Sequence, residues 1–258
     1  MAILSQVAVP VHAEETLRIG SKRFTESYVL GELLLRTASP HGAALHKQGM
    51  GNTGILVAAL RGDAIDVYPE YSGTIAREVL KMQSNPSLEE LNRNLAPLGL
   101  AASVPLGFNN SYALGVREDL AAKLGISAIG DLAKSTSLKW GFSHEFLARQ
   151  DGWPGLSKAY GLQTVSPSGL DHGIAYEALA AGRVDVIDLY STDAKIARYK
   201  LRVLDDDKRY FPRYQALLLH RAEVPARFPK QWRALESLKG RIDEPGMIAM
   251  NAAAEIEG

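Results

Sequence analysis

Residues 57–74 read VAALRGDAIDVYPEYSGT, and residues 176–193 read YEALAAGRVDVIDLYSTD. At one constant offset and without a gap, the identical pairs are Ala59-Leu60 with Ala178-Leu179, Asp66-Val67 with Asp185-Val186, and Tyr71-Ser72 with Tyr190-Ser191. Both copies have the pattern of a helix end, a glycine-containing turn and an apolar strand that finishes in Tyr-Ser. We interpret them as one unit present in each of two α/β lobes. Chance similarity between two generic helix–strand units is the alternative.

Short apolar strands alternate with amphipathic helices along most of the chain. Strands are expected at 16–20, 43–48 and 64–68, and near 112–117, 138–142, 184–189, 201–204 and 215–220. Helices are expected between them, including 25–38, which would begin with Thr25 as its N-cap and carry Glu26 in its first turn. This alternation predicts the α/β class, with parallel-rich sheets covered by helices. Because ligands bind at the carboxyl edges of such sheets, two facing edges would form a cleft.

The composition is that of a soluble globular protein without a polyanionic partner. The 258 residues are 46% hydrophobic and 22% charged, and the formal net charge is +0 at pH 7. These values do not favour binding to nucleic acid or to an anionic membrane surface. No apolar run reaches the roughly 18 residues that a membrane span requires. A chain without cysteine has no disulfide, thiolate metal site or lipid-modified cysteine anchor.

The first 14 residues have features of an export signal. Their apolar run ends in Val11-His12-Ala13, which fits the small-x-small pattern of a signal-peptidase site, although a basic region before it is missing. We interpret residues 1–14 as a signal-peptide remnant. The alternative is an N-terminus without targeting meaning.

Several tyrosines fall at expected strand ends or in loops rather than on helix faces: Tyr68, Tyr71, Tyr112, Tyr190, Tyr210 and Tyr214. A tyrosine in such a place either belongs to the core with its hydroxyl satisfied or lines a ligand cleft. Converging rings bind a cation through the ring quadrupole, at about 0.5–2 kcal/mol for each contact. A quaternary ammonium suits such a cage, because it has no N–H group that would lose a water partner there.

Two expected helix starts, 20–26 and 49–54, place small or hydroxyl residues where backbone N–H groups are unpaired. Such a position attracts a carboxylate or phosphate, and plain capping by Thr25 and by Asn52 or Thr53 is the alternative. Neither stretch matches a nucleotide-binding motif.

Catalytic motifs are weak. HEFLAR at 144–149 lacks the second histidine of a zinc protease, and the six histidines are dispersed, so we expect no metal and no cofactor. No G-x-S-x-G is present. An enzyme is not expected. The alternative is a cleft hydrolase using Ser191 or Ser72, which requires a histidine within hydrogen-bonding reach.

The chain resembles the substrate-binding component of ABC importers for glycine betaine, choline, carnitine and related osmoprotectants. The matching phrases stand in family order over about residues 16–255: IGSKRFTESYVLGELL, GNTGILVAALRGDAIDVYPEYSGT, GFNNSYALGVREDLA, EFLARQDGWPGLSKAYGL, ALAAGRVDVIDLYSTDAKI and VLDDDKRYFPRYQA. The resemblance implies a periplasmic-binding-protein fold, type II-like, with two α/β lobes joined by two crossover strands. Lobe one would comprise 15–106 plus 206–258, and lobe two 107–205.

The resemblance also implies a ligand site in the cleft. Tyr112, Tyr190 and Tyr214 match cage tyrosines of the family. Ser72 stands where the family usually has a threonine that holds the ligand's polar end, and Ser27 where it often has glutamine. The remaining candidate ligand-binding residues are Phe24, Thr25, Asn52, Thr53, Tyr71, Asn110, Ser191, Thr192 and Arg213.

The function implied is capture of a quaternary-ammonium osmolyte such as glycine betaine, choline or carnitine, and its delivery to ABC permease subunits. A different zwitterion or an amino acid, for example ergothioneine, is the alternative on the same fold. A sensory domain with a charged clamp around an amino acid, which Arg213 would suit, is a further one. We expect a periplasmic monomer that closes about crossovers near 107–110 and 204–207 and binds no nucleic acid.

Overall fold

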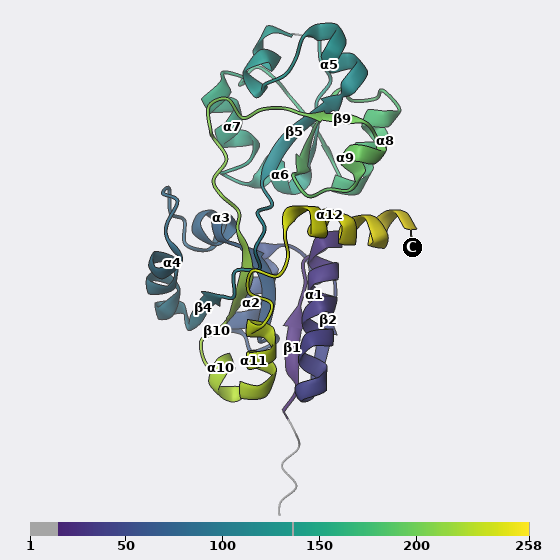
Figure 1. Ribbon diagram of the computed structural model, residues 1–258. Coiled ribbons are helices and arrows are strands. Elements are labelled where there is room, and N and C mark those ends of the chain that lie inside the picture. Colours follow the sequence, from purple (N-terminus) through teal and green to yellow (C-terminus); the bar gives the residue numbers. More distant parts are fainter. Residues whose placement is uncertain (1–14, 136, 258) are drawn as a thin grey trace, which may run out of the picture.

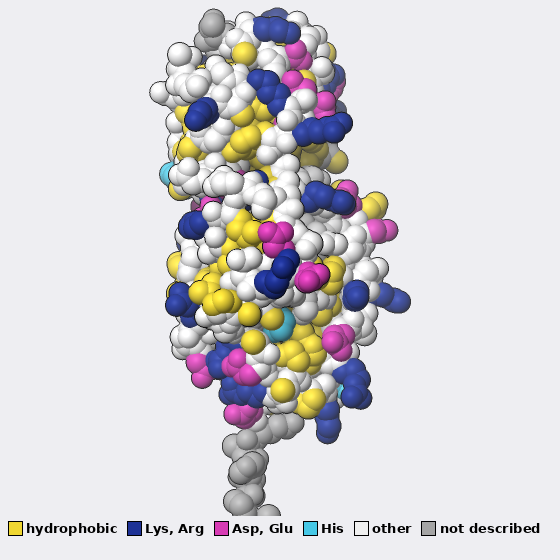
Figure 2. Space-filling model, turned by 90° about the vertical axis from the view of Figure 1, so that its left-hand side faces the viewer, with side chains coloured by type: hydrophobic (Ala, Val, Ile, Leu, Met, Phe, Trp, Pro, Cys, Tyr) yellow, Lys and Arg dark blue, Asp and Glu magenta, His cyan; other side chains and the backbone are white. Residues whose placement is uncertain are grey.

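The computed structural model describes residues 15–135 and 137–257, and shows two lobes joined by two crossing segments (Figure 1). The interpretation of residues 1–14 as a signal-peptide remnant lies outside the described residues. Seen from the side, the lobes are stacked, and positive and negative side chains are interspersed over that face (Figure 2). In the described part of the chain, no helix combines the length and apolar character needed to cross a bilayer.

Lobe one is built on a five-stranded sheet with the order β2-β1-β3-β10-β4. Its strands are β1 (Leu17–Gly20), β2 (Ala44–Lys47), β3 (Val67–Tyr71), β4 (Leu100–Ser103) and β10 (Ala216–Arg221). Its helices are α1 (Thr25–Ala38), α2 (Thr53–Arg61), α3 (Ser72–Thr74), α4 (Leu88–Leu95), α10 (Val224–Arg227), α11 (Pro229–Glu236) and α12 (Glu244–Ala252). Helix α1 packs on the sheet because Leu30, Leu34 and Ala38 recur every four residues on its buried side.

Lobe two contains a three-stranded sheet, β8-β5-β9, and a parallel pair, β6-β7. Its strands are β5 (Tyr112–Arg117), β6 (Gly141–Ser143), β7 (Ser168–Leu170), β8 (Val186–Tyr190) and β9 (Leu201–Val203). Its helices are α5 (Glu118–Leu124), α6 (His144–Ala148), α7 (Trp153–Tyr160), α8 (His172–Ala180) and α9 (Lys195–Arg198). A bridge between Trp140 and Val186 connects the β6 end to β8.

Short 3₁₀ and π turns complete the element order. The 3₁₀ turns are Ser39–His41, Ala96–Leu98 and Ile129–Lys134, and the π turns are Ile75–Val79 and Ala253–Glu257. The last of these continues α12 towards the C-terminal end of the described chain.

The repeated stretch forms the same unit in both lobes, as predicted. Helix α2 with strand β3 and helix α8 with strand β8 have equal lengths and equal spacing. Asp66 donates its N–H to the Arg18 carbonyl (2.7 Å) and accepts the Arg18 N–H on its carboxylate (2.8 Å). Asp185 makes the same reciprocal pair with Lys139, at 2.7 and 2.9 Å. In each lobe, the shared aspartate directly precedes its strand, and its hydrogen bonds hold the start of that strand against the backbone of a neighbouring segment.

The sheets are mixed, so the expectation of parallel-rich sheets is wrong. Strand β1 runs parallel to β2 and β3, whereas β10 is antiparallel to both of its neighbours, and so is β5. Strands β5 and β10 are the two that directly follow a crossing between lobes, so each enters its sheet against the direction of its neighbours. Strands β4 and β7 were not predicted.

The two crossing segments pair with each other between the lobes (Figure 1). Asn109 and Gln215 form an antiparallel bridge. Asn110 donates its N–H to the Tyr214 carbonyl at 3.0 Å. The prediction of two α/β lobes joined by two crossovers is confirmed, and this pairing brings residues of the crossovers next to the facing edges of both sheets.

Candidate functional site

An aromatic cluster lies where the facing edges of the two lobes meet the crossovers. We define the aromatic cluster as Phe24, Tyr112, Phe146, Tyr190, Phe211 and Tyr214. Tyr112 begins β5 and Tyr190 ends β8, and the two are paired directly across the antiparallel ladder. Because such a pair places both side chains on the same side of the sheet, their ring centroids lie 5.1 Å apart. The strand register therefore builds this part of the cluster.

The cluster joins groups that are distant in the sequence. The Tyr214 ring, from the second crossover, lies 5.8 Å from Tyr112, and the Phe24 ring, from lobe one, lies 5.5 Å from Tyr190. The structure thus brings together the three predicted cage tyrosines and Phe24. Phe146 and Phe211, at 5.2 and 6.2 Å from Tyr112, were not predicted.

A buried cation from lobe two lies against this cluster. The Arg149 guanidinium carbon is 5.3 Å from the Tyr112 ring centroid, and the side chain donates to both carboxylate oxygens of Asp151 at 2.8 and 2.6 Å. The Tyr214 hydroxyl also donates to Asp151 at 2.7 Å. Although burial opposes the effect, the hydrogen bonds and charge of Arg149 hold the pKa of the Asp151 carboxyl below its usual value.

A second buried cation comes from lobe one. Lys22, in the turn between β1 and α1, is 5% exposed and places its ammonium 2.7 Å from a Glu70 carboxylate oxygen. The same ammonium lies 5.5 Å from the Phe24 ring centroid and 5.1 Å from that of Tyr71. Sequence reasoning missed Lys22 and Arg149, because isolated basic residues in polar stretches have the same pattern whether they are buried or on the surface.

Several predicted ligand contacts instead converge on a carboxylate. We define the Glu26 network as Glu26, Tyr71, Asn110, Thr192 and Asn251. The Tyr71 hydroxyl and the Asn110 amide donate to one Glu26 oxygen at 2.5 and 2.9 Å. The Thr192 hydroxyl and the Asn251 amide donate to the other at 2.5 and 2.9 Å. Burial raises the pKa of Glu26, while these four hydrogen bonds act in the opposite direction.

Most of the predicted residues at the helix starts make contacts within the helices and the turns that precede them. Phe24, with extended backbone, is the N-cap of α1, so the expectation that Thr25 caps this helix is wrong. Thr25 is the first helical residue, and its hydroxyl donates to Glu255. The Ser27 hydroxyl accepts the Lys22 N–H at 2.8 Å. The Ser27 side chain therefore holds the turn that carries Lys22.

The start of α2 confirms the capping interpretation. Asn52 is the N-cap, and its side chain accepts the Ile55 N–H at 3.2 Å. Thr53 donates its hydroxyl to Glu70 at 3.2 Å, next to the Lys22–Glu70 ion pair.

The two repeated serines hold the crossovers. Ser72 donates its N–H to the Gln215 carbonyl (3.0 Å), and its hydroxyl accepts the Gln215 N–H (3.1 Å). Ser191 makes the same reciprocal pair with Ser111, at 2.9 and 3.0 Å. Each serine therefore fixes one crossover at the point where it enters a lobe.

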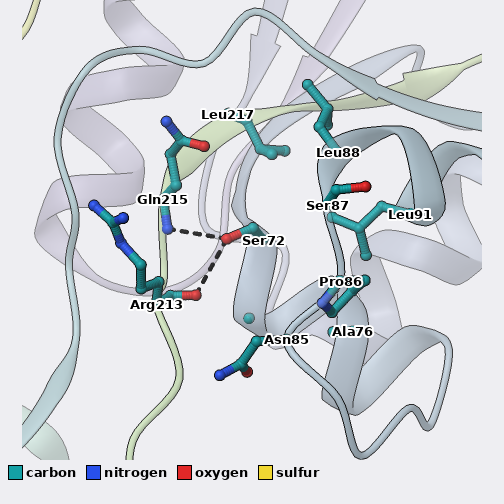
Figure 3. A pocket seen from close by; sticks show the side chains of 11 residues that line it. Ser72, Ala76, Asn85, Pro86, Ser87, Leu88, Leu91, Arg213, Gln215 and Leu217 are labelled. Atoms are coloured by element: carbon teal, nitrogen blue, oxygen red, sulfur yellow. Dashed lines mark hydrogen bonds between the residues drawn. The ribbon is translucent and has the colours of Figure 1, made fainter.

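Ser72 also lines a pocket of about 280 Å³ in lobe one (Figure 3). In that view Arg213 lies on the side opposite Leu91 and extends its guanidinium away from Pro86. The structure brings Ser72 and Arg213 together here, and it does not bring either side chain into the aromatic cluster.

A second pocket, of about 380 Å³, opens between the lobes and reaches the aromatic cluster at Phe24 and Tyr190. Its lining includes Lys22 and Asn52 from lobe one and Glu145 and His172 from lobe two. The His172 ring centroid is 4.5 Å from that of Tyr190. Although burial opposes the effect, the carboxylates of Asp193 and Asp188 raise the pKa of His172 to about 10.

Among residues 15–135 and 137–257, neither the Ser72 nor the Ser191 hydroxyl has a histidine as hydrogen-bond partner. The same residues contain no group of three or more histidine or acidic side chains arranged to hold a metal ion.

Comparison with sequences gives consistent matches over nearly the whole chain. The family model described as the substrate binding domain of ABC-type glycine betaine transport systems matches residues 15–258. The glycine-betaine-binding protein of Pseudomonas aeruginosa is 34% identical over 261 residues, covering 94% of this chain and 83% of that protein. The ergothioneine transport permease/ergothioneine binding protein of Helicobacter pylori is 32% identical over 255 residues. That alignment covers 94% of this chain and 45% of the relative.

Solved structures show the same fold. A crystal structure of a glycine betaine/carnitine/choline ABC transporter matches with a TM-score of 0.74 and 27% identity, covering 94% of this chain and 93% of that one. The lactococcal protein in its closed, glycine betaine-bound conformation matches with a TM-score of 0.67 over 93% of this chain and 89% of that one. At 12% identity, the latter supports the fold alone.

Proposed function

The chain belongs to the family of substrate-binding domains of ABC-type glycine betaine transport systems, a transporter component and not an enzyme, and from that premise we propose its ligand. The proposed ligand is a zwitterion that carries a methylated ammonium and a carboxylate, such as glycine betaine or carnitine. The chain would hold it between the lobes and deliver it to the permease subunits.

The aromatic cluster between two buried cations carries this proposal. A methylated ammonium rests against ring faces without losing hydrogen bonds, and each ring contributes about 0.5–2 kcal/mol. Lys22 uses one of its three N–H donors on Glu70. Arg149 uses Nε and Nη2 on Asp151, while its Nη1 has a 3.6 Å contact with Glu145. Both cations therefore retain donors for a ligand carboxylate beside the rings.

Ligand entry would require the lobes to separate. The pocket between the lobes is the natural entrance, since it reaches Phe24 and Tyr190 from the solvent side. The two reciprocal serine pairs, Ser72 with Gln215 and Ser191 with Ser111, anchor the crossovers about which the lobes would rotate. The proposed lobes of this motion are 15–106 plus 206–258 and 107–205, except that residues 206–208 would move with lobe two, because Asp206 accepts the Tyr160 hydroxyl (2.6 Å) and Asp207 accepts the Gly130 N–H (3.0 Å). The second crossover therefore follows these residues, and the expectation of a crossover near 204–207 is wrong.

Isothermal titration calorimetry tests the ligand class. The purified chain is titrated with glycine betaine, carnitine, choline, ergothioneine and glycine. We expect binding of at least one methylated zwitterion, and glycine at least tenfold weaker because its ammonium would lose water partners among the rings. Binding of glycine as tightly as glycine betaine, or binding of no methylated ammonium, contradicts the proposal.

Ergothioneine is the second candidate, and one buried acceptor favours it. The Asn110 side-chain oxygen has no hydrogen-bond partner within the described residues. A betaine has no N–H donor, whereas the imidazole-type ring of ergothioneine has. If this oxygen accepts a ligand N–H, ergothioneine binds more tightly than glycine betaine, and Asn110→Leu removes the difference. Equal weakening of both ligands by that variant argues against this second candidate.

The protein's location and assembly follow the family. Family members are solute-binding components outside the cytoplasm, and we propose that this one is a periplasmic monomer without nucleic-acid affinity. Light scattering after size exclusion should give a mass near the 28.0 kDa of one chain. A stable dimer at micromolar concentration would contradict the monomer.

A further inference from the structure

The C-terminal segment of lobe one reaches across to lobe two. Helix α12 lies between the upper end of α1 and lobe two (Figure 1). The Asn251 amide donates to the Thr192 backbone carbonyl of lobe two at 3.1 Å. Four residues later, Glu255 approaches Lys195 of lobe two at 3.7 Å and accepts the Thr25 hydroxyl of lobe one. The C-terminal segment therefore contacts both lobes, first through Asn251 and again through Glu255.

The Glu26 network unites these contacts at one carboxylate. Its donors come from the end of β3, the first crossover, lobe two and α12. Glu26 and Asn251 are each 3% exposed, and Thr192 is 1% exposed. Thr192 and Glu26 belong to opposite lobes, so their 2.5 Å hydrogen bond exists only while the lobes are together.

The same geometry leaves the Glu26 carboxylate few free acceptor sites for a ligand. A carboxylate offers about four acceptor sites, and each Glu26 oxygen already accepts two hydrogen bonds. Hydrogen bonds to an ionised acceptor are also stronger than hydrogen bonds between neutral groups. Glu26 is thus satisfied by protein donors alone, and its contribution to binding would come through the arrangement of the lobes.

We propose that Glu26 is a positioning residue that holds the lobes together through Thr192 and Asn251, and so slows ligand release without touching the ligand. The statement about release rests on the proposed function. The statement about the lobes does not, because the network consists of protein groups only.

The distance between the lobes is the direct readout. The chain has no cysteine, so Arg61→Cys in lobe one and Lys123→Cys in lobe two, both exposed, introduce a unique pair for spin labels. Pulsed electron–electron double resonance then measures the distribution of distances between the two spin labels, with and without the ligand found by calorimetry. We expect Glu26→Gln to shift the population towards longer distances relative to the labelled parent.

A matched control separates this role from general effects on α1. Glu32→Gln makes the same chemical change on the same helix, where Glu32 is half-buried and pairs with the exposed Arg36. It should leave the distances unchanged. Thr192→Val should reproduce the Glu26→Gln result, and Thr192→Ser, which keeps the hydroxyl donor, should restore the parental distances. These Thr192 variants keep the test available if Glu26→Gln does not fold.

Stopped-flow release adds the functional readout. Loss of a hydrogen-bonded buried charge predicts a release rate about ten- to a hundredfold faster in Glu26→Gln, with little change in the association rate. Equal distances and equal release rates in Glu26→Gln and Glu32→Gln overturn the proposal. A parental chain whose lobes stay apart with and without ligand also overturns it. A chain without any ligand refutes the proposed function, while the ligand-free distances still decide the role of Glu26.

Discussion

Tyr112 and Tyr190 face each other across the antiparallel strands β5 and β8, with ring centroids 5.1 Å apart. This pair is the centre of the aromatic cluster, since Tyr112 also contacts Tyr214 and Tyr190 also contacts Phe24. Its position is fixed by the ladder register, so its rings keep their relative placement when the lobes move.

Removing one ring face should weaken binding by a limited amount. We expect Tyr112→Leu to raise the dissociation constant of a methylated zwitterion about 2- to 30-fold, the equivalent of one cation–π contact. Tyr112→Phe keeps the ring and should change it much less. Calorimetry measures both. Tyr199→Leu, a tyrosine in lobe two that packs on Tyr176 instead, is the control, and an equal loss there would argue against the cage.

The buried cations should favour ligands that carry a carboxylate over ligands that lack one. Arg149→Lys keeps the charge but not the bidentate geometry, so it should weaken glycine betaine or carnitine more than choline, which has no carboxylate. The measurement is the ratio of dissociation constants for carnitine and choline, compared between variant and parent. An unchanged ratio would show that Arg149 does not hold the carboxylate. The melting temperature must be measured alongside, because Arg149 also pairs with Asp151.

The repeated serines should affect stability more than affinity. Ser72→Ala and Ser191→Ala each remove one hydrogen bond to a crossover N–H, at a cost of about 0.5–1.5 kcal/mol in the free energy of unfolding. Denaturant unfolding should show this cost for both variants. A Ser72→Ala chain with parental stability but a much weaker ligand affinity would instead show that Ser72 touches the ligand.

His172 should make stability depend on pH. Its folded pKa is raised to about 10 from 6.5, so its contribution is complete below pH 6.5 and is lost as the pH rises towards 10. We expect the free energy of unfolding of the parent to fall by a few kcal/mol over this window, and that of His172→Gln to fall less. Urea unfolding at several pH values measures the slopes.

Local features of the fold could be predicted from sequence because they depend on neighbours in the chain. The repeat predicted α2 with β3 and α8 with β8, and capping by Asn52 or Thr53 was one of the two interpretations of the stretch before α2. The strand directions could not be predicted. The alternation pattern is the same for β10 and β5 whichever way they enter a sheet, and the crossings between lobes decide that direction.

By itself, the sequence determined two related α/β lobes and several tyrosines at strand ends or in loops, because periodicity and turn residues act over a few positions. The placement of Tyr68 at a strand end is wrong, since Tyr68 is the second residue of β3 and is fully buried. Only the tertiary structure decided the partners of the polar groups. Thr192 and Asn251 meet Glu26 across 166 and 225 residues of chain, and no local pattern encodes such a meeting. Burial likewise separates Lys22 and Arg149 from other basic residues, since desolvation depends on the packed lobes and not on the spacing of residues.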